Sequence, residues 1–286
     1  MDRAYILKIS CRDRPGVVAG LTTALFEIGA NITEAQQFND AATGNFFMRV
    51  EFVASAECFD AGELHKALEP TIEQFGLEWS LRPADQRKKV IILVSKQDHC
   101  MGDLLYRLRI GELSMDVVAI ISNHPISELK MSIIGEIPYH YLPITPDTKA
   151  RQEAQIKQIV NETGAELVIL ARYMQILSDE LSKFLEGRCV NIHHSSLPGF
   201  KGARPYHQAY DRGVKLIGAT AHLVTSELDE GPIIEQDIDH ITHNDLPDDL
   251  VRKGRDIERR VLARAVTYLL QDRVLLNGSK TVVFRQ

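Results

Sequence analysis

The sequence lacks a membrane-length apolar run, clustered cysteines and an excess of basic residues. Its N-terminus has no apolar core followed by a cleavage site, so we expect neither a secretory signal nor a membrane partner. The four cysteines are scattered without C-x-x-C spacing, which disfavours a disulfide framework and favours the reducing cytoplasm. A formal net charge of -6 argues against nucleic acid as the main partner, because phosphate binding needs a basic face.

Motifs for several kinds of chemistry are missing as well. No G-x-G-x-x-G, Walker loop, H-E-x-x-H or G-x-S-x-G motif occurs in the chain. The adjacent His193 and His194 also lack the i, i+4 spacing of a helical zinc pair. The sequence therefore predicts no metal, no nucleotide cofactor and no covalent nucleophile.

The 286 residues are enough for two domains, and the hydrophobic pattern changes near residue 85. Residues 83–89 are polar and carry no period, so we place a linker there and divide the chain into domains at 1–84 and 85–286. In the first domain, apolar alternation marks strands and apolar spacing of three and four marks helices. Their order is β-α-β-β-α-β, which is the ferredoxin-like α+β arrangement.

A turn in the first domain carries a family resemblance. The segment Asp13-Arg14-Pro15-Gly16, with Asn31 at the next strand, makes this domain resemble an ACT domain, the amino-acid-sensing module. The resemblance implies a regulatory ligand site at Asp13, Arg14, Pro15, Gly16 and Asn31, since N–H groups at a helix N-terminus can hold a carboxylate. The alternative is that Pro15 and Gly16 only shape a tight turn in a domain that dimerises.

The second domain has a different pattern. Continuous apolar segments at 90–94, 116–121 and 167–170 are separated by helical stretches near 98–109 and 148–161. Apolar strands that alternate with helices predict a Rossmann-like, mostly parallel α/β sheet. Sheets of this kind bind ligands at the carboxyl ends of their strands.

The candidate catalytic residues are Asn191, His193 and Asp229. Asn191 and His193 lie two apart on a predicted strand, so their side chains should point the same way. A carboxamide can stabilise an oxyanion, an imidazole can carry a proton, and a carboxylate can accept a proton from water. His222 is a candidate partner that orients Asp229, with a buried structural role as the equal alternative. His194 should point to the opposite side.

A second resemblance rests on these residues. The motif Asn191-Ile192-His193-His194-Ser195-Ser196-Leu197-Pro198, with Leu228-Asp229-Glu230-Gly231-Pro232, resembles that of folate-dependent formyltransferases over about residues 89–243. The resemblance implies that Asn191, His193 and Asp229 act on the formyl group of 10-formyltetrahydrofolate. Residues 170–177 resemble the family's folate loop. The implied folate-binding residues are Tyr173, Met174, Gln175, Ile176, Leu177, Glu227 and Leu228.

One loop departs from the purine-pathway transferases of this family, in which a Gly/Ser-rich loop after the first strand holds the acceptor's phosphate. Here the loop that begins at Ser95 is bulky and lacks the glycines that expose N–H groups to phosphate. Without an acceptor, water is the nucleophile, and an ACT-like domain joined to this catalytic domain is the layout of formyltetrahydrofolate deformylases. The resemblance implies hydrolysis of 10-formyltetrahydrofolate to formate and tetrahydrofolate, with no cofactor required. This reaction would supply formate for purine synthesis and balance the one-carbon folate pools.

Two other functions stay open. A folate-dependent formyltransferase with an amine acceptor would turn over only when an acceptor is present. An amino-acid-responsive regulatory protein would bind folate without turnover. As an effector, glycine or methionine would suit a one-carbon enzyme, and we expect a homodimer or homotetramer.

Overall fold

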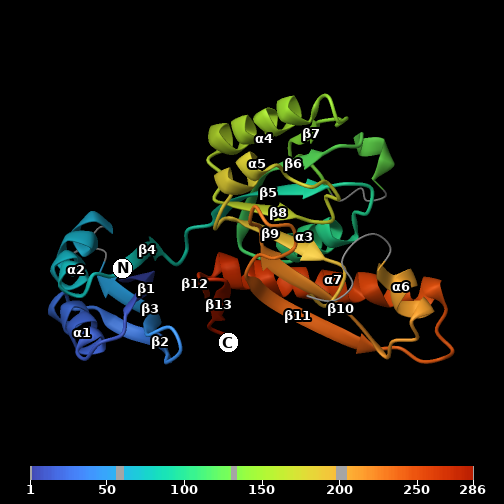
Figure 1. Ribbon diagram of the computed structural model, residues 1–286. Helices are drawn as coiled ribbons and strands as arrows, with labels where there is room; N and C mark the ends of the chain where they lie inside the picture. Colours follow the sequence, from blue (N-terminus) through green and yellow to red (C-terminus); the bar gives the residue numbers. More distant parts are fainter. Residues whose placement is uncertain (1, 56–60, 130–133, 198–204, 286) are drawn as a thin grey trace. The chain divides into compact units, whose positions relative to one another are not determined.

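The computed structural model describes residues 2–55, 61–129, 134–197 and 205–285 (Figure 1). The chain forms two compact units, Met1–Gln86 with Gln271–Gln286, and Arg87–Leu270. The predicted division into 1–84 and 85–286 differs from these units at the C-terminus. The reason is that residues 271–286 make hydrogen bonds and apolar contacts with the first unit, which sequence periodicity does not reveal.

The first unit contains a four-stranded antiparallel sheet with the strand order β2-β3-β1-β4. Its elements are β1 (Asp2–Arg12), α1 (Val17–Glu27), β2 (Asn31–Asp40), β3 (Asn45–Ser55), α2 (Ala61–Phe75) and β4 (Glu78–Pro83). This order confirms the predicted ferredoxin-like arrangement. Alternate residues of β1, such as Leu7 and Ile9, are buried with Leu21 and Leu25 of α1 in one hydrophobic core.

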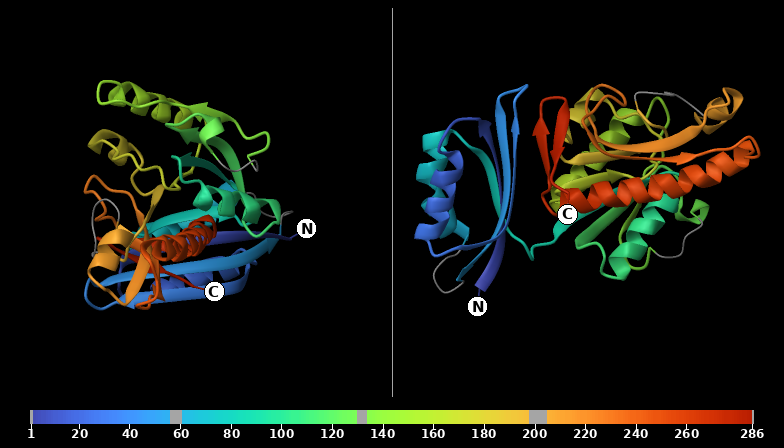
Figure 2. Two further views of the ribbon diagram at one scale, coloured as in Figure 1. Left: turned by 90° about the vertical axis from the view of Figure 1, so that its right-hand side faces the viewer. Right: turned by 90° about the horizontal axis from the view of Figure 1, so that it is seen from below.

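The other face of this sheet is covered by a C-terminal hairpin (Figure 2). The hairpin consists of β12 (Val274–Asn277) and β13 (Lys280–Val283). Phe47 of β3 packs there in a small apolar cluster with Leu275 and Phe284. Strand β3 is therefore buried on both faces from Phe46 to Val50, although the apolar alternation in the sequence marks only one face.

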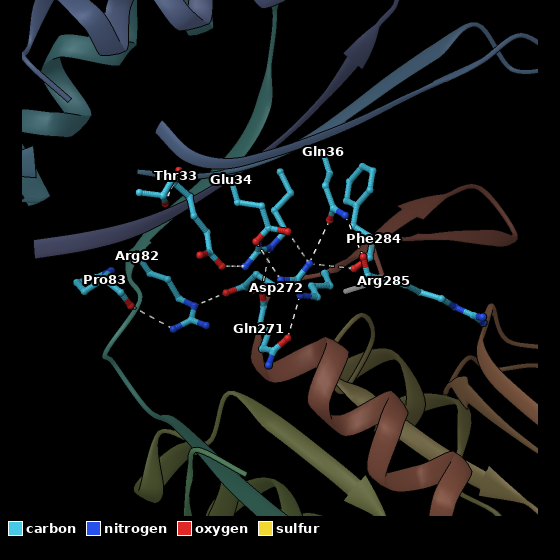
Figure 3. A network of polar contacts seen from close by, with 12 residues as sticks. Thr33, Glu34, Gln36, Arg82, Pro83, Gln271, Asp272, Phe284 and Arg285 are labelled. Atoms are coloured by element: carbon cyan, nitrogen blue, oxygen red, sulfur yellow. Dashed lines mark hydrogen bonds and ion pairs between the residues drawn. The ribbon is translucent and has the colours of Figure 1, made fainter. Parts of the chain in front are cut away.

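Polar contacts join the hairpin region to the sheet, and Figure 3 shows them from close by. Arg49 is 1% exposed and donates from Nε to the carbonyl oxygen of Gln271 at 3.0 Å. Arg273 donates to both carboxylate oxygens of Glu34, each at 3.1 Å. These buried guanidinium groups are thus paired, as burial of a charge requires.

The second unit contains a seven-stranded sheet with the strand order β11-β10-β9-β8-β5-β6-β7. The strands are β5 (Lys88–Val94), β6 (Met115–Ser122), β7 (Tyr139–Tyr141), β8 (Leu167–Leu170), β9 (Cys189–His193), β10 (Leu216–Leu223) and β11 (Ile233–His240). The pairs from β9 to β7 are parallel, and β10 and β11 add antiparallel pairs. The predicted mostly parallel sheet is confirmed.

Helices cover both faces of the larger sheet (Figure 1). α4 (Lys149–Thr163) and α5 (Asp179–Phe184) lie on one face, and α3 (His99–Arg109) and α7 (Pro247–Leu270) lie on the other. The remaining short elements are η1 (Ile126–Glu128) and α6 (Pro205–Asp211). In the described part of the chain, no helix combines the length and the apolar composition that crossing a bilayer requires.

Candidate active site

Strands β9 and β10 place Asn191 and His222 next to each other. The two residues are paired directly across the antiparallel ladder, and His193 is paired with Thr220 in the same way. Residues paired directly across a ladder project to the same face of the sheet. Asn191, His193 and His222 therefore share one face, as the sequence predicts for the first two. Pro198, at the end of the predicted motif, lies outside the described residues.

Both ring nitrogens of His222 have protein neighbours. Nδ1 lies 2.9 Å from the carbonyl oxygen of Leu223, and because a carbonyl only accepts, Nδ1 carries a proton. Nε2 lies 3.2 Å from Nδ2 of Asn191 and 3.7 Å from Oδ1 of Asp229. The pairing of β10 with β11 shifts register next to His222, and such irregularities redirect side chains. His222 thus contacts Asn191 as well as Asp229, the single partner that the sequence suggested.

Asp229 reaches the same point from the loop after β10. Its Oδ1 lies 3.2 Å from Nδ1 of His193. The backbone of Asp229 is left-handed, with φ of 58°, a conformation that aspartate tolerates better than most residues. Gly231 lets the loop pass close to β10, because a Cβ there would overlap the carbonyl oxygen of Leu223. The loop conformation therefore determines where the carboxylate lies.

The protonation of Asp229 depends on the two neighbouring histidines, His193 and His222. The hydrogen bond from His193, and next the neighbouring imidazole of His222, hold the pKa of the Asp229 carboxyl well below its usual range. The carboxylate is therefore ionised at neutral pH. The other ring nitrogen of His193, Nε2, is buried and has no hydrogen-bond partner among the described residues. A buried imidazole nitrogen of this kind is suited to exchange a proton with a bound molecule.

These residues line one cavity of about 640 Å³, all of whose lining residues belong to the second unit. Its volume lies in the range of small-molecule sites. Three apolar side chains line it while staying largely exposed: Met174 at 58%, Ile176 at 61% and Leu228 at 56%. The predicted folate-binding residues Gln175, Leu177 and Glu227 line it too. The cavity thus joins the polar candidate catalytic groups to an apolar wall that a flat ring would cover.

Tyr173 also borders the cavity, but its ring belongs to the hydrophobic core. Its hydroxyl accepts a hydrogen bond from Gln152, and burial raises its pKa. Its carbonyl oxygen accepts a hydrogen bond from the hydroxyl of Ser95. The side chain of Tyr173 therefore anchors the loop after β8 instead of offering its ring to the cavity.

A second set of cavity residues was not predicted from the sequence. Arg172 is 6% exposed and left-handed, with φ of 65°. It donates from Nε and Nη2 to Oε1 of Gln97 at 3.1 and 2.8 Å, and from Nη1 to Nδ1 of His194. Its Nε also lies 3.4 Å from a carboxylate oxygen of Glu258. We call Arg172, Gln97, His194 and Glu258 the Arg172 cluster; all four line the cavity.

The placement of His194 differs from the expectation that it points away from the site. Its ring centroid lies 5.2 Å from that of His193, and it lines the same cavity. The reason is that β9 ends at His193, so strand alternation does not extend to the next residue. Because a guanidinium only donates, the contact with Arg172 makes Nδ1 of His194 an acceptor.

Glu258 is 1% exposed and accepts hydrogen bonds on both carboxylate oxygens. Tyr206 bonds one oxygen at 2.7 Å, and Nε2 of His99 bonds the other at 2.7 Å. Burial raises its pKa, but the hydrogen bond from His99 and the charge of Arg172 outweigh burial, and the net pKa is lowered. A charged residue on the buried stripe of α7, between Gly254 and Leu262, is the sequence signal that could have revealed it.

Among the described residues, His99, Cys100 and Glu258 place possible ligand atoms within 4.8 Å of one another. Glu258 is already paired on both oxygens, and the cationic Arg172 lies beside it. Burial raises the pKa of the Cys100 thiol well above its usual value, so the sulfur is a neutral thiol. These contacts favour an internally paired cluster over a metal site.

In the first unit, the turn predicted to bind a regulatory ligand precedes α1. Oδ2 of Asp13 accepts a hydrogen bond from Asn39 at 2.8 Å. Arg14 donates to the carbonyl of Gln74, and its guanidinium lies 4.9 Å from the centroid of Phe75. Pro15 connects these residues to the helix start. The side chains of the turn are thus already tied to β2 and α2.

Gly16 and Asn31 complete the predicted regulatory set. Gly16 is left-handed, with φ of 97°, which glycine adopts without strain. Asn31 pairs with Val53 at one end of β2, whereas Asp40 pairs with Asn45 at the other end, next to the turn. Within one chain, therefore, Asn31 is not brought together with the turn residues.

Comparison with known proteins adds the family context of this geometry. Residues 88–266 match the family model for formyl transferase, and residues 5–69 match the model for the ACT domain. A formyltetrahydrofolate deformylase of Corynebacterium sp. (strain P-1) is 45% identical over 281 residues, which cover 98% of each chain. One of Bacillus subtilis (strain 168) is 43% identical over 284 residues, or 99% of this chain and 94% of the relative.

Solved structures give the same result. The crystal structure of a formyltetrahydrofolate deformylase from Burkholderia mallei ATCC 23344 is similar with a TM-score of 0.93 and 48% identity. The match covers 99% of this chain and 100% of that one. The similarity thus extends over both units.

Proposed function

The chain belongs to the formyl transferase family and, within it, to the formyltetrahydrofolate deformylases, and we propose that it hydrolyses 10-formyltetrahydrofolate to formate and tetrahydrofolate. The observation that carries this proposal is the convergence of Asn191, His193 and Asp229 on one cavity. No cofactor is required, because water is the second reactant and the side chains provide acid–base chemistry.

The residues of the trio have separate tasks in this proposal. The pterin ring covers the apolar wall at Met174, Ile176 and Leu228, and the formyl group lies over β9. One N–H of the Asn191 carboxamide is oriented by Nε2 of His222, and the other donates to the formyl oxygen as it becomes negative. Nε2 of protonated His193, which has no protein partner among the described residues, donates to the same region.

The proton path follows from the lowered pKa of Asp229. Water attacks the formyl carbon while Asp229 takes one of its protons, and a tetrahedral intermediate forms. His193 then gives its proton to N10, the C–N10 bond breaks, and formic acid leaves and ionises. Asp229 is a weak base and releases this proton to solvent, and Nε2 of His193 takes up a proton from solvent, because Nδ1 keeps the proton that faces Asp229 at 3.2 Å. The net products are formate, tetrahydrofolate and one proton.

The test is incubation of the purified full chain with 10-formyltetrahydrofolate alone. We expect formate and tetrahydrofolate to accumulate in equal amounts, and Asp229→Asn should lower the rate at least about 100-fold through loss of acid–base catalysis. Turnover that requires an added amine would instead indicate a formyltransferase. Near-normal hydrolysis by Asp229→Asn would contradict the role given to this carboxylate.

The first unit suggests regulation of this reaction by a small amino acid. An effector such as glycine or methionine would bind at the turn of Asp13, Arg14, Pro15 and Gly16. Since Asn31 lies at the far end of β2, its participation requires the turn of a second copy of the chain. A homodimer or homotetramer, as predicted from the sequence, would provide that copy.

A further inference from the structure

A parallel sheet with helices on both faces binds ligands preferentially in the crevice where its strand order reverses. In this chain, side chains occupy that crevice. From β5 the chain proceeds through β6 to β7 in one direction, and then through β8 to β9 in the other. The order therefore reverses between β5 and β8, and the helices that follow these two strands, α3 and α5, lie on opposite faces of the sheet. Ligands of open α/β sheets bind in such a crevice. Here a second substrate would lie beside Asn191 and His193 on β9.

The two loops are joined directly across this crevice. The backbone N–H of Ser95, after β5, donates to the carbonyl oxygen of Arg172, after β8, at 3.2 Å. The Ser95 hydroxyl donates to the carbonyl of Tyr173. The guanidinium of Arg172 reaches back and donates twice to Gln97. Main-chain and side-chain contacts thus connect the loops between which a ligand would have to enter.

The Arg172 cluster is also fixed by contacts with α7. Glu258 on α7 lies 3.4 Å from the guanidinium and is itself bonded by Tyr206 and His99. A ligand that displaced Arg172 would leave the buried Glu258 carboxylate without its guanidinium partner, which is strongly unfavourable. A water molecule, with a volume of about 30 Å³, needs no such displacement.

We propose that the Arg172 cluster closes the crevice between β5 and β8 to a second substrate and so reserves the formyl group for water. This inference rests on the proposed hydrolysis and names what determines its nucleophile. Opening the crevice would admit a small amine. Its nitrogen would bond to the formyl carbon and lose one proton, while the C–N10 bond breaks and N10 gains one. The products would be an N-formyl amide and tetrahydrofolate, without any change of oxidation state.

The test is competition between water and glycinamide for a ¹³C-labelled formyl group. The decisive variant is Arg172→Gly, because a left-handed residue is replaced by glycine without backbone strain. Label in formate and in N-formylglycinamide is measured by NMR, with an enzyme-free blank subtracted. For the unchanged chain we expect formate at every glycinamide concentration. For Arg172→Gly the amide-to-formate ratio should rise at least about tenfold, the lower range of discrimination by a filled pocket.

The matched control is Met174→Gly. Met174 is left-handed too, with φ of 59°, and it lies in the same loop and lines the same cavity. The hydrogen bonds and the ion pair that hold the Arg172 cluster together do not involve it. Its substitution should weaken folate binding without changing the amide-to-formate ratio.

The outcomes separate this inference from the proposed function. If the unchanged chain forms no formate without glycinamide, the proposed hydrolysis is wrong. If it forms formate, and a folded Arg172→Gly chain gives the same ratio, the role of the cluster is wrong. Should that variant fail to fold, Gln97→Ala replaces it, since Gln97 is exposed and its loss also frees Arg172 to move. An unchanged ratio in Gln97→Ala would likewise overturn the inference, as would an equal rise in Met174→Gly.

Discussion

Asn191 on β9 and His222 on β10 are paired directly across the ladder, and their side-chain nitrogens Nδ2 and Nε2 lie 3.2 Å apart. The same Nε2 lies 3.7 Å from Asp229. One imidazole therefore links the carboxamide that would bind the oxyanion to the carboxylate that would receive a proton. Because its other nitrogen is fixed on the backbone of Leu223, Nε2 of His222 stays beside both groups and accepts a hydrogen bond from the Asn191 carboxamide.

This linkage predicts non-additive losses. Asn191→Ala should lower kcat about 100- to 1,000-fold, as loss of an oxyanion donor does. His222→Ala should lower it less, and the double variant should lose less than the product of the two single losses, since the residues act as a unit. The measurement is kcat for formate release. His240→Ala, an exposed histidine of β11 that does not line the cavity, should have normal kcat. Multiplicative losses would show that Asn191 and His222 act independently.

The convergence of Asn191, His193 and Asp229 on one cavity could be predicted because their geometry is local. Asn191 and His193 are two apart on one strand, and strand alternation alone places them on the same face. Asp229 was found through a loop motif with glycine and proline, which limits the loop's conformations. The two fold types were predictable for the same reason, since apolar periodicity is set by neighbours in sequence.

Other features depend on contacts between distant segments, and the sequence did not predict them. The Arg172 cluster joins residues from two loops, from the residue after β9 and from α7, and no periodicity relates them. His194 was placed on the wrong side because alternation fails where a strand ends. The C-terminal hairpin was assigned to the second domain, since only tertiary contacts such as Phe47 with Phe284 reveal its partner.

Gly231 should be required for activity. A Cβ at this position would overlap the carbonyl oxygen of Leu223 and lie 3.3 Å from Nδ1 of His222. We expect Gly231→Ala to displace the Asp229 loop, lower kcat at least about 100-fold through loss of acid–base catalysis, and destabilise the chain by about 1–3 kcal/mol through overpacking. Formate release and calorimetric unfolding measure the two effects.

The control for this variant is Gly213→Ala. Gly213 is left-handed with open space around its Cα, so alanine there costs about 1 kcal/mol of backbone strain. Its kcat should stay normal. Equal kcat for the two variants would mean that the close approach at Gly231 does not position Asp229.

Asp229 should also make stability depend on pH. Its pKa is lower in the folded chain than the value of about 3.9 in an unfolded one, chiefly through the hydrogen bond from His193. The ionised carboxylate therefore stabilises the fold fully above the unfolded pKa, and this stabilisation decreases as the pH falls from about 4 toward the lower folded pKa. Asp229→Asn removes the titrating group. The difference in unfolding free energy between the unchanged chain and this variant should be largest near neutral pH and shrink with acidification. Urea titrations at several pH values measure this difference. A difference that stays constant with pH would contradict the lowered pKa.

The C-terminal hairpin should stabilise the first unit through Arg273. Its side chain is 3% exposed and donates to both oxygens of Glu34, so Arg273→Ala should lower the unfolding free energy by about 1.5–3 kcal/mol, the range for hydrogen bonds to charged groups.

The control is Arg3→Ala, because Arg3 and Asp85 form an ion pair in the same unit with side chains 46% and 69% exposed. Such exposed pairs contribute at most about 1 kcal/mol. The chain has one tryptophan, Trp79 on β4, and its fluorescence during denaturant unfolding reports on this unit. If the two variants unfold at the same denaturant concentration, the hairpin contributes no more to the first unit than a surface ion pair does.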